Sequence, residues 1–200
     1  MGPIETTRPR LAPAFGEAIA AYDLPTGVHS ARVGALARAV GALLDLSEAD
    51  LEALTFAGTL HDLGKLGVPE RTLAWPGPLD AAQWQEIKCH PTIGADLVRS
   101  RSPPSGGSFC HQLDIAAAGI ETHHERFDGS GYPAGYAGEE IPLIGRIVGL
   151  VDVYDSMTQQ RSYRDRAFTS EEALGHLAEN AGTLFDPTLV PVVSEVARRR

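Results

Sequence analysis

His123-His-Glu-Arg-Phe-Asp-Gly-Ser-Gly-Tyr-Pro133 is the stretch of sequence that does most to decide the fold. An apolar segment with helical spacing, Ile115–Ile120, precedes it, and it runs into a glycine-rich segment, 128–135, that cannot be helical. Two consecutive histidines therefore stand where an apolar helix gives way to a loop. Taken alone, such a pair is more typical of a solvated helix end than of a metal site, so its meaning depends on the rest of the chain.

Helical signals dominate on both sides of this stretch. Ser47 followed by Asp50 has the spacing of a helix start, and an apolar stripe follows it in a helix expected over 47–63. Strand-like alternation is scarce, so the sequence predicts an all-α bundle of about seven to nine helices with one glycine-rich loop. Further helix starts are expected at Asp80 with Gln83, at Thr169 with Glu172, and at Asp186 before Pro187.

Length and composition are those of one globular domain. The chain has 200 residues, of which 43% are hydrophobic, so it can bury a substantial core. Residues 1–13 contain three prolines and two arginines, and we expect them to be a poorly ordered lead-in to a single domain over 14–200. No apolar run approaches the roughly 20 residues that a membrane helix needs, and no signal peptide is visible. Two cysteines make no disulfide framework, which favours the cytoplasm.

The net charge limits the possible partners. A formal charge of −9 argues against a protein that binds nucleic-acid polymers, because such a protein presents a basic face. The charge does not exclude a small phosphate ligand, since bound cations and a few arginines can reverse the local potential inside an acidic protein.

Several histidines and aspartates indicate metal binding when they are taken together. His61-Asp62 falls near the end of its predicted helix, where alone it reads as a helix cap. Asp152 lies within the apolar segment Ile147–Val153, where a carboxylate is costly unless it is paired or binds a metal. Two cations about 3.5–4 Å apart suit phosphodiester hydrolysis. The candidate ligands are His29, His61, Asp62, His90, His123, His124 and Asp152.

These residues lie in motifs that resemble the HD-GYP branch of the HD phosphohydrolase superfamily. The resemblance covers about residues 20 to 195, and its most specific part is the His-His-Glu to Gly-Tyr-Pro string. The matching stretches are Thr26–Val33, Leu60–Leu66, His90–Gly94, His123–Pro133, Asp152–Thr158, Arg161–Arg164 and Ala181–Pro187.

The resemblance implies a helical HD-GYP catalytic domain around two divalent metal ions, iron or manganese, that hydrolyses cyclic di-GMP through a metal-bridging hydroxide. Carried over by position, one ion would be held by His29, His61, Asp62 and Asp152. The second would be held by His90, His123 and His124, with Asp62 as the bridge. Lys65, Arg161 and Arg164 would contact the substrate phosphates, and Tyr132 would shape the nucleotide site.

Supporting roles remain open at this point. The leaving oxygen needs a proton, which could come from Lys65, Asp155 or water. Asp155 lies one turn beyond Asp152 and could orient a ligand, relay a proton or form a salt bridge. We expect Glu125 to orient the histidines, because metal-bound imidazoles usually need such partners.

Two departures from the family pattern affect these expectations. Some members carry a glutamate four residues before the first histidine, where it helps to bind a third metal, and Pro25 stands there in this chain. We therefore predict a dinuclear centre and a single cleavage to linear pGpG. The loop over 100–108 is longer than expected and could be a mobile flap or a tolerated insertion.

Other functions are compatible with the same motifs. The domain could hydrolyse another cyclic dinucleotide, or it could be a non-catalytic cyclic-dinucleotide receptor or protein-interaction module. The complete ligand set argues against the receptor. Control by a regulatory partner or through a homodimer is also open.

Overall fold

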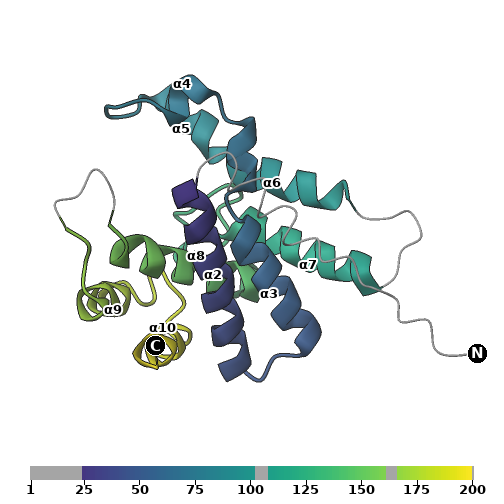
Figure 1. Ribbon diagram of the computed structural model, residues 1–200, viewed down its shortest axis with the longest axis vertical. Helices are drawn as coiled ribbons and strands as arrows, with labels where there is room; N and C mark the ends of the chain where they lie inside the picture. The colour runs from purple at the N-terminus through teal and green to yellow at the C-terminus, as the bar shows by residue number, and fades with distance from the viewer. Residues whose placement is uncertain (1–23, 102–107, 161–165, 200) are drawn as a thin grey trace, which may run out of the picture.

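The computed structural model describes residues 24–101, 108–160 and 166–199, and within these ranges it is built from helices (Figure 1). The described residues form no strand, and an isolated bridge between Ala181 and Phe185 is the one β-type pairing among them. The all-α prediction is confirmed. The helices are α2 (Leu24–Leu43), α3 (Glu48–Leu60), α4 (Glu70–Leu73), α5 (Ala81–Lys88), α6 (His90–Arg99), α7 (Ser108–Thr122), α8 (Leu143–Thr158), α9 (Ser170–Glu179) and α10 (Val190–Arg198), with short 3₁₀ helices η1 (Leu63–Gly67) and η2 (Gly138–Glu140).

Polar side chains begin the helices largely where the sequence predicts. The Ser47 hydroxyl accepts a hydrogen bond from the Asp50 amide at the start of α3. Reciprocal capping boxes begin α5 and α9, as expected. The prediction at Asp186 is wrong, because α10 begins four residues later, at Val190. The Asp186 carboxylate instead accepts bonds from the amide and hydroxyl of Thr188, which closes a turn before the helix.

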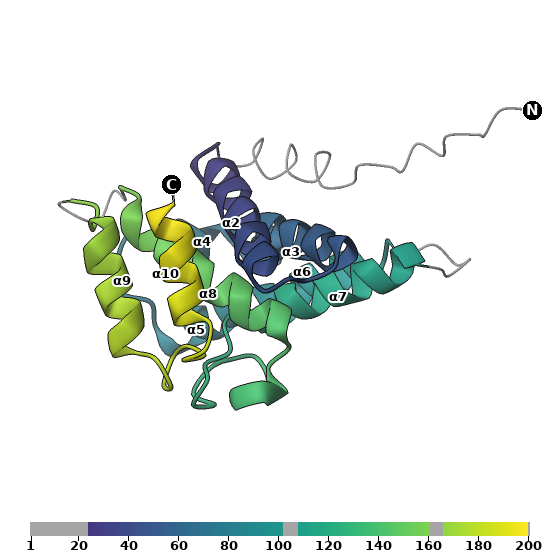
Figure 2. The ribbon, with the colours of Figure 1, turned by 90° about the horizontal axis from the view of Figure 1, so that it is seen from below.

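Helix α8 is the centre of the bundle. It contacts α2, α3, α7, α9 and α10, and Figures 1 and 2 show it between the α2–α3 pair and the α9–α10 pair. Its residues Ile147, Val148 and Val151 are completely buried in the core. Burying such side chains contributes roughly 1.5–3 kcal/mol each, so α8 ties the two halves of the domain together.

The crossing of α2 and α3 depends on two glycines. A Cβ atom added to Gly58 would lie 2.8 Å from the Cα atom of Gly34, so the two backbones touch directly. His29 lies five residues before Gly34, and His61 lies three residues after Gly58. The close crossing therefore brings two histidines from different helices to one place.

A second backbone contact joins α8 to the segment that follows α7. A Cβ atom added to Gly149 would overlap the carbonyl oxygen of His123. Asp152 lies three residues further along α8, on the next turn of the helix. The absence of a side chain at Gly149 thus allows Asp152 to approach the paired histidines.

The segment α4–α5 lies apart from the core. Figure 1 shows both helices at one end of the molecule, at the top of the view. No residue of α5 is buried, whereas the other helices of eight residues or more for which burial is described each bury several. This segment is therefore held by few apolar contacts.

Some predictions concern parts of the chain that the structure does not describe. The lead-in 1–13, most of the loop 100–108, and Arg161 and Arg164 lie outside the described residues. Among the residues that are described, no helix has both the length and the apolar character needed to cross a bilayer.

The contact at Gly149 predicts the effect of a single methyl group. Gly149→Ala should lower the free energy of unfolding by about 1–3 kcal/mol, because the new Cβ forces α8 away from His123. Gly175 in α9 has nothing within 4 Å of its added Cβ. As a matched control, Gly175→Ala should raise stability by roughly 0.5–1 kcal/mol through helix propensity. Urea unfolding followed by circular dichroism measures both changes, and equal effects at the two positions would contradict the contact.

Candidate metal centre

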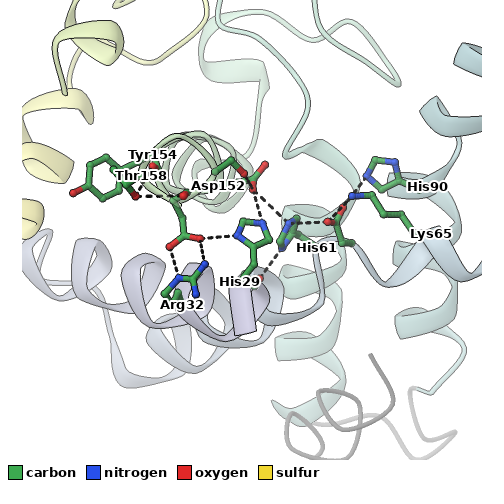
Figure 3. A network of polar contacts seen from close by, with 12 residues as sticks. His29, Arg32, His61, Lys65, His90, Asp152, Tyr154 and Thr158 are labelled. Carbon is green, nitrogen blue, oxygen red and sulfur yellow. Dashed lines mark hydrogen bonds and ion pairs between the residues drawn. The ribbon is translucent and has the colours of Figure 1, made fainter. Parts of the chain in front are cut away.

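The seven candidate ligands, which are far apart in the sequence, converge at one place in the bundle. They come from α2, the end of α3, the start of α6, the end of α7 and the middle of α8. Figure 3 shows four of them, His29, His61, His90 and Asp152. Helix α3 ends at Leu60, slightly earlier than predicted, so that His61 is its C-cap residue and Asp62 leads into η1. Of the seven histidines in the chain, only His111 and His176 lie outside this cluster.

One group of possible ligands consists of His29, His61 and Asp152. One donor atom from each lies within 4.8 Å of the other two, which is close enough for a single cation. The Oδ1 atom of Asp152 is 3.0 Å from Nε2 of His29 and 3.6 Å from Nε2 of His61. A carboxylate with two imidazoles is a suitable set for a borderline divalent metal.

The other group consists of His90, His123 and His124. Their donor atoms also lie within 4.8 Å of one another. The His90 ring centroid is 5.4 Å from that of His123 and 5.0 Å from that of His124. Three imidazoles can hold a divalent cation, and a carboxylate between the two groups could join this cation to the first.

Asp62 occupies that position. Its Oδ2 atom is 3.4 Å from Nε2 of His61, and its Oδ1 atom is 3.5 Å from Nε2 of His90. The two oxygens of one carboxylate thus face different ligand groups. Lys65, one turn further along the chain, places its ammonium 2.6 Å from Oδ2 of Asp62.

Main-chain carbonyl groups orient three of the imidazoles. The Nδ1 atoms of His61, His90 and His123 lie 2.8, 2.8 and 2.6 Å from the carbonyl oxygens of Gly58, Ile87 and Ile120 respectively. A carbonyl oxygen only accepts hydrogen bonds, so Nδ1–H is the donor and Nε2 keeps its lone pair.

The three Nε2 atoms have no partner among the described residues. Each is buried and makes no hydrogen bond. A buried polar atom without a hydrogen bond costs about 1–3 kcal/mol, and the nearby Asp62 oxygens do not meet hydrogen-bond geometry. The nitrogens of His61 and His90 lie 3.4 and 3.5 Å from oxygens of the Asp62 carboxylate, and that of His123 belongs to the second ligand group. Buried nitrogens without partners beside a carboxylate fit a site for divalent metal ions.

His29 is oriented differently, by a carboxylate. Its Nδ1 lies 2.7 Å from Oδ2 of Asp155, while its Nε2 faces Asp152 (Figure 3). Arg32 donates to both oxygens of Asp155, at 2.7 and 2.8 Å. Asp155 thus holds His29 from the side opposite the ligand group. Arg32 follows His29 by one helical turn, but its pairing with Asp155 was not predicted from the sequence.

The charge states of the cluster suit cation binding. Burial raises the pKa values of Asp62 and Asp152, but neighbouring histidines, with Lys65 beside Asp62, outweigh it and hold both values below the usual range. Burial lowers the pKa of His124 to about 4 and that of His123 well below 6.5. The two carboxylates are therefore anionic at pH 7, and His123 and His124 are neutral, which is the state in which an imidazole binds a metal.

His29 and His61 differ from the other imidazoles. Burial lowers the pKa of His29, but Asp152 and Asp155 raise it above its usual value. Burial also lowers the pKa of His61, but Asp62, Asp152 and the Gly58 carbonyl raise it to about 9. The same anionic surroundings would attract a cation in place of that proton.

Glu125 does not orient the histidines, contrary to our expectation. Its carboxylate accepts hydrogen bonds from the amides of Ala134 and Gly135, at 2.7 to 3.1 Å. It therefore fixes the glycine-rich loop above the centre. The loop in turn places Tyr132 on His124, with the rings stacked at a centroid distance of 4.8 Å and an interplanar angle of 28°.

Comparison with known proteins agrees with this arrangement. A family model described as "HD domain" matches residues 14–189. The chain belongs to the HD domain family. Its relatives at 33–38% identity over most of the chain are of the HD-GYP type, which confirms the resemblance.

Two relatives of this HD domain are phosphodiesterases named for their cyclic dinucleotides. It is 36% identical over 95% of its length to the cyclic di-GMP phosphodiesterase response regulator RpfG of Xanthomonas campestris, and it covers 48% of that protein. It is 33% identical over 96% of its length to 3'3'-cGAMP-specific phosphodiesterase 2 of Vibrio cholerae, of which it covers 35%. The chain thus spans less than half the length of either relative.

A solved structure has a similar fold. The crystal structure of the cyclic GMP-AMP specific phosphodiesterase V-cGAP3 of Vibrio cholerae superposes with a TM-score of 0.63 at 25% identity. The match covers 85% of this HD domain and 44% of that chain.

The central position of Asp62 predicts a loss of metal from both groups when it is removed. Asp62→Ala should reduce bound iron or manganese from about two ions per chain to roughly one or fewer, because the carboxylate faces both groups. Asp96→Ala, at an exposed position of α6, is the control and should keep the full content. Elemental analysis of anaerobically purified protein measures both. A third tightly held ion in the wild type would contradict a dinuclear centre.

The contact between Asp155 and His29 predicts a smaller, local effect. Asp155→Ala should weaken metal binding by about 10- to 100-fold, because His29 loses the partner that holds its ring. Competition with a chelator of known affinity measures the change. Equal affinities in the variant and the wild type would show that Asp155 has no positioning role.

Proposed function

We propose that this HD domain hydrolyses a phosphodiester bond of a cyclic dinucleotide, with cyclic di-GMP as substrate and linear pGpG as the main product. The observation that carries the proposal is the pair of ligand groups around Asp62, with three buried Nε2 atoms that have no hydrogen-bond partner among the described residues. The names of the two relatives described above, a cyclic di-GMP phosphodiesterase and a 3'3'-cGAMP-specific phosphodiesterase, also support it.

Two bound cations would supply Lewis-acid polarisation of the phosphoryl group and a water of lowered pKa. The residues of the chain would bind and orient these cations. Asp62, Asp152 and the imidazoles would be the ligands, and the main-chain carbonyls and Asp155 keep the rings in position. Iron or manganese suits this mixed nitrogen and oxygen set.

Lys65 is suited to contact a substrate phosphate. Its side chain is 39% exposed while its ammonium reaches the buried Asp62, so it lies where the centre opens to solvent. A positive charge there would neutralise charge that develops on phosphoryl oxygens. Arg161 and Arg164 remain predicted phosphate ligands because they match the family motif by position.

The proton for the departing ribose oxygen comes, in this proposal, from Lys65 or from water. Asp155 is a poor donor, because both of its oxygens are engaged by His29 and Arg32 and its pKa is held below the usual range. Burial raises that pKa, but the bonds from His29 and Arg32 outweigh the effect. We therefore assign Asp155 a positioning role and no proton transfer.

The substrate has to bind across the open face of the centre. A cavity of about 190 Å³ adjoins His123 and His124 beside α8 and α9, and it is lined also by Arg126, Arg146 and His176. Sites for small-molecule ligands occupy roughly 300–1,000 Å³, so this cavity is too small for a cyclic dinucleotide. The face bounded by Lys65 and Tyr132 is the alternative that the proposal requires.

The direct test is hydrolysis by protein purified without oxygen and loaded with iron or manganese. We expect conversion of cyclic di-GMP to pGpG, read by chromatography, with GMP appearing slowly or not at all. Asp62→Ala should lower kcat by on the order of 1,000-fold or more, because both ligand groups lose their shared carboxylate.

Alternative outcomes identify the rival functions. Faster turnover of 3'3'-cGAMP than of cyclic di-GMP would mean that 3'3'-cGAMP is the substrate, with the same phosphodiester hydrolysis. Tight binding of a cyclic dinucleotide without turnover in fully metal-loaded protein would contradict hydrolysis and show that the domain is a receptor.

A further inference from the structure

Trp84 is a large aromatic residue that contributes little to the core. It lies on α5, a helix with no buried residue, and 44% of its surface is exposed. Tryptophan is enriched at interfaces, where one part of the ring packs on the protein and the rest can contact a partner. The position of Trp84 relative to the metal centre points to a ligand as that partner.

An aromatic series connects Trp84 to the metal centre. The Trp84 ring lies 6.5 Å from the Tyr132 ring at an angle of 65°, and Tyr132 stacks on the candidate ligand His124. Trp84 is therefore two rings away from a metal ligand, with its outer surface in solvent.

Lys88 adds a positive charge at the same place. It follows Trp84 by one helical turn, and its Nζ atom lies 5.8 Å from the Trp84 ring centroid and 5.5 Å from that of Tyr132. No carboxylate among the described residues is within ion-pair distance of this ammonium. Its three N–H donors are thus available to a ligand that stacks on Trp84.

We propose that Trp84 is a stacking platform for one base of the cyclic dinucleotide and that Lys88 selects guanine there. This inference rests on the proposed function and specifies the base recognition at the same site. A guanine edge offers the acceptors O6 and N7, whereas adenine has an amino group in place of O6. An ammonium beside the stacked base therefore favours guanine over adenine.

The location of the platform is consistent with simultaneous binding to the metals. The order outward from the metal centre is His124, Tyr132, Trp84 and then the stacked base. In this proposal, the phosphodiester attached to that base binds at the open face near Lys65. The two functions, base recognition and phosphate chemistry, are then carried by different segments of the chain, α5 and the bundle.

Tryptophan fluorescence tests the stacking directly. The chain has two tryptophans, Trp75 and Trp84, so Trp75→Phe leaves Trp84 as the only tryptophan emitter. Stopped-flow mixing of this metal-loaded variant with cyclic di-GMP should quench the emission before turnover begins. An emission that does not change at saturating cyclic di-GMP would overturn the platform.

Kinetics test the role in substrate binding. Trp84→Leu should raise the KM for cyclic di-GMP by about 10- to 100-fold, as expected for the loss of one base–aromatic stack, with a smaller change in kcat. Trp84→Phe should recover most of the affinity. Trp75→Leu, which removes an equally exposed tryptophan outside the aromatic series, should leave both constants unchanged. Wild-type constants in a folded Trp84→Leu protein would overturn the inference.

Lys88→Met tests the selection of guanine. The ratio of kcat/KM for cyclic di-GMP to that for 3'3'-cGAMP should fall by about 5- to 20-fold, a change that a purely structural lysine would not produce. An unchanged ratio would overturn the role of Lys88. If the wild type hydrolysed neither dinucleotide, the proposed function would fail, whereas quenching of Trp84 by cyclic di-GMP would still support the platform.

Discussion

A carboxylate buried as deeply as that of Asp62, which is 8% exposed, needs positive charge close by to remain ionised. Lys65 supplies one charge at 2.6 Å, but Asp152 adds a second anion to the same pocket. His61, whose pKa is raised to about 9, compensates for it while it holds a proton. A bound cation would take the place of that proton, so the pocket suits divalent metal ions.

Helix ends explain how the imidazoles are held. The last four carbonyl groups of an α-helix have no partner within the helix. Gly58, Ile87 and Ile120 lie in the last turns of α3, α5 and α7, and each accepts a hydrogen bond from a histidine three residues later. One bond thus satisfies a helix terminus and fixes a ring, which makes each histidine part of the fold as well as part of the site.

The fold and most of the candidate site follow from local sequence patterns. Helix starts at Ser47, Asp80 and Thr169 could be predicted because a capping side chain and its amide partner are three residues apart. The carboxylate of Asp152 was informative because it interrupts an apolar segment.

Partners that are distant in the sequence could not be predicted in the same way. The expectation that Glu125 orients the histidines failed because the amides of Ala134 and Gly135 reach it only after the loop has folded back. The pairing of Arg32 with Asp155 spans 123 residues and depends on the packing of α2 against α8. Trp84 stood out in no pattern, since its neighbours in space come from the glycine-rich loop.

Because three of the rings are oriented by main-chain oxygens, no side-chain replacement can remove those acceptors. The donor nitrogens of His61, His90 and His123 would keep their orientation through side-chain changes nearby that leave the helix ends and the glycine contacts in place. In such a scaffold, the orientation of the metal ligands depends on the helix ends, whereas substrate recognition can depend on other segments. New substrate preferences could arise on an outlying segment such as α5 without disturbing the donor atoms that the reaction requires.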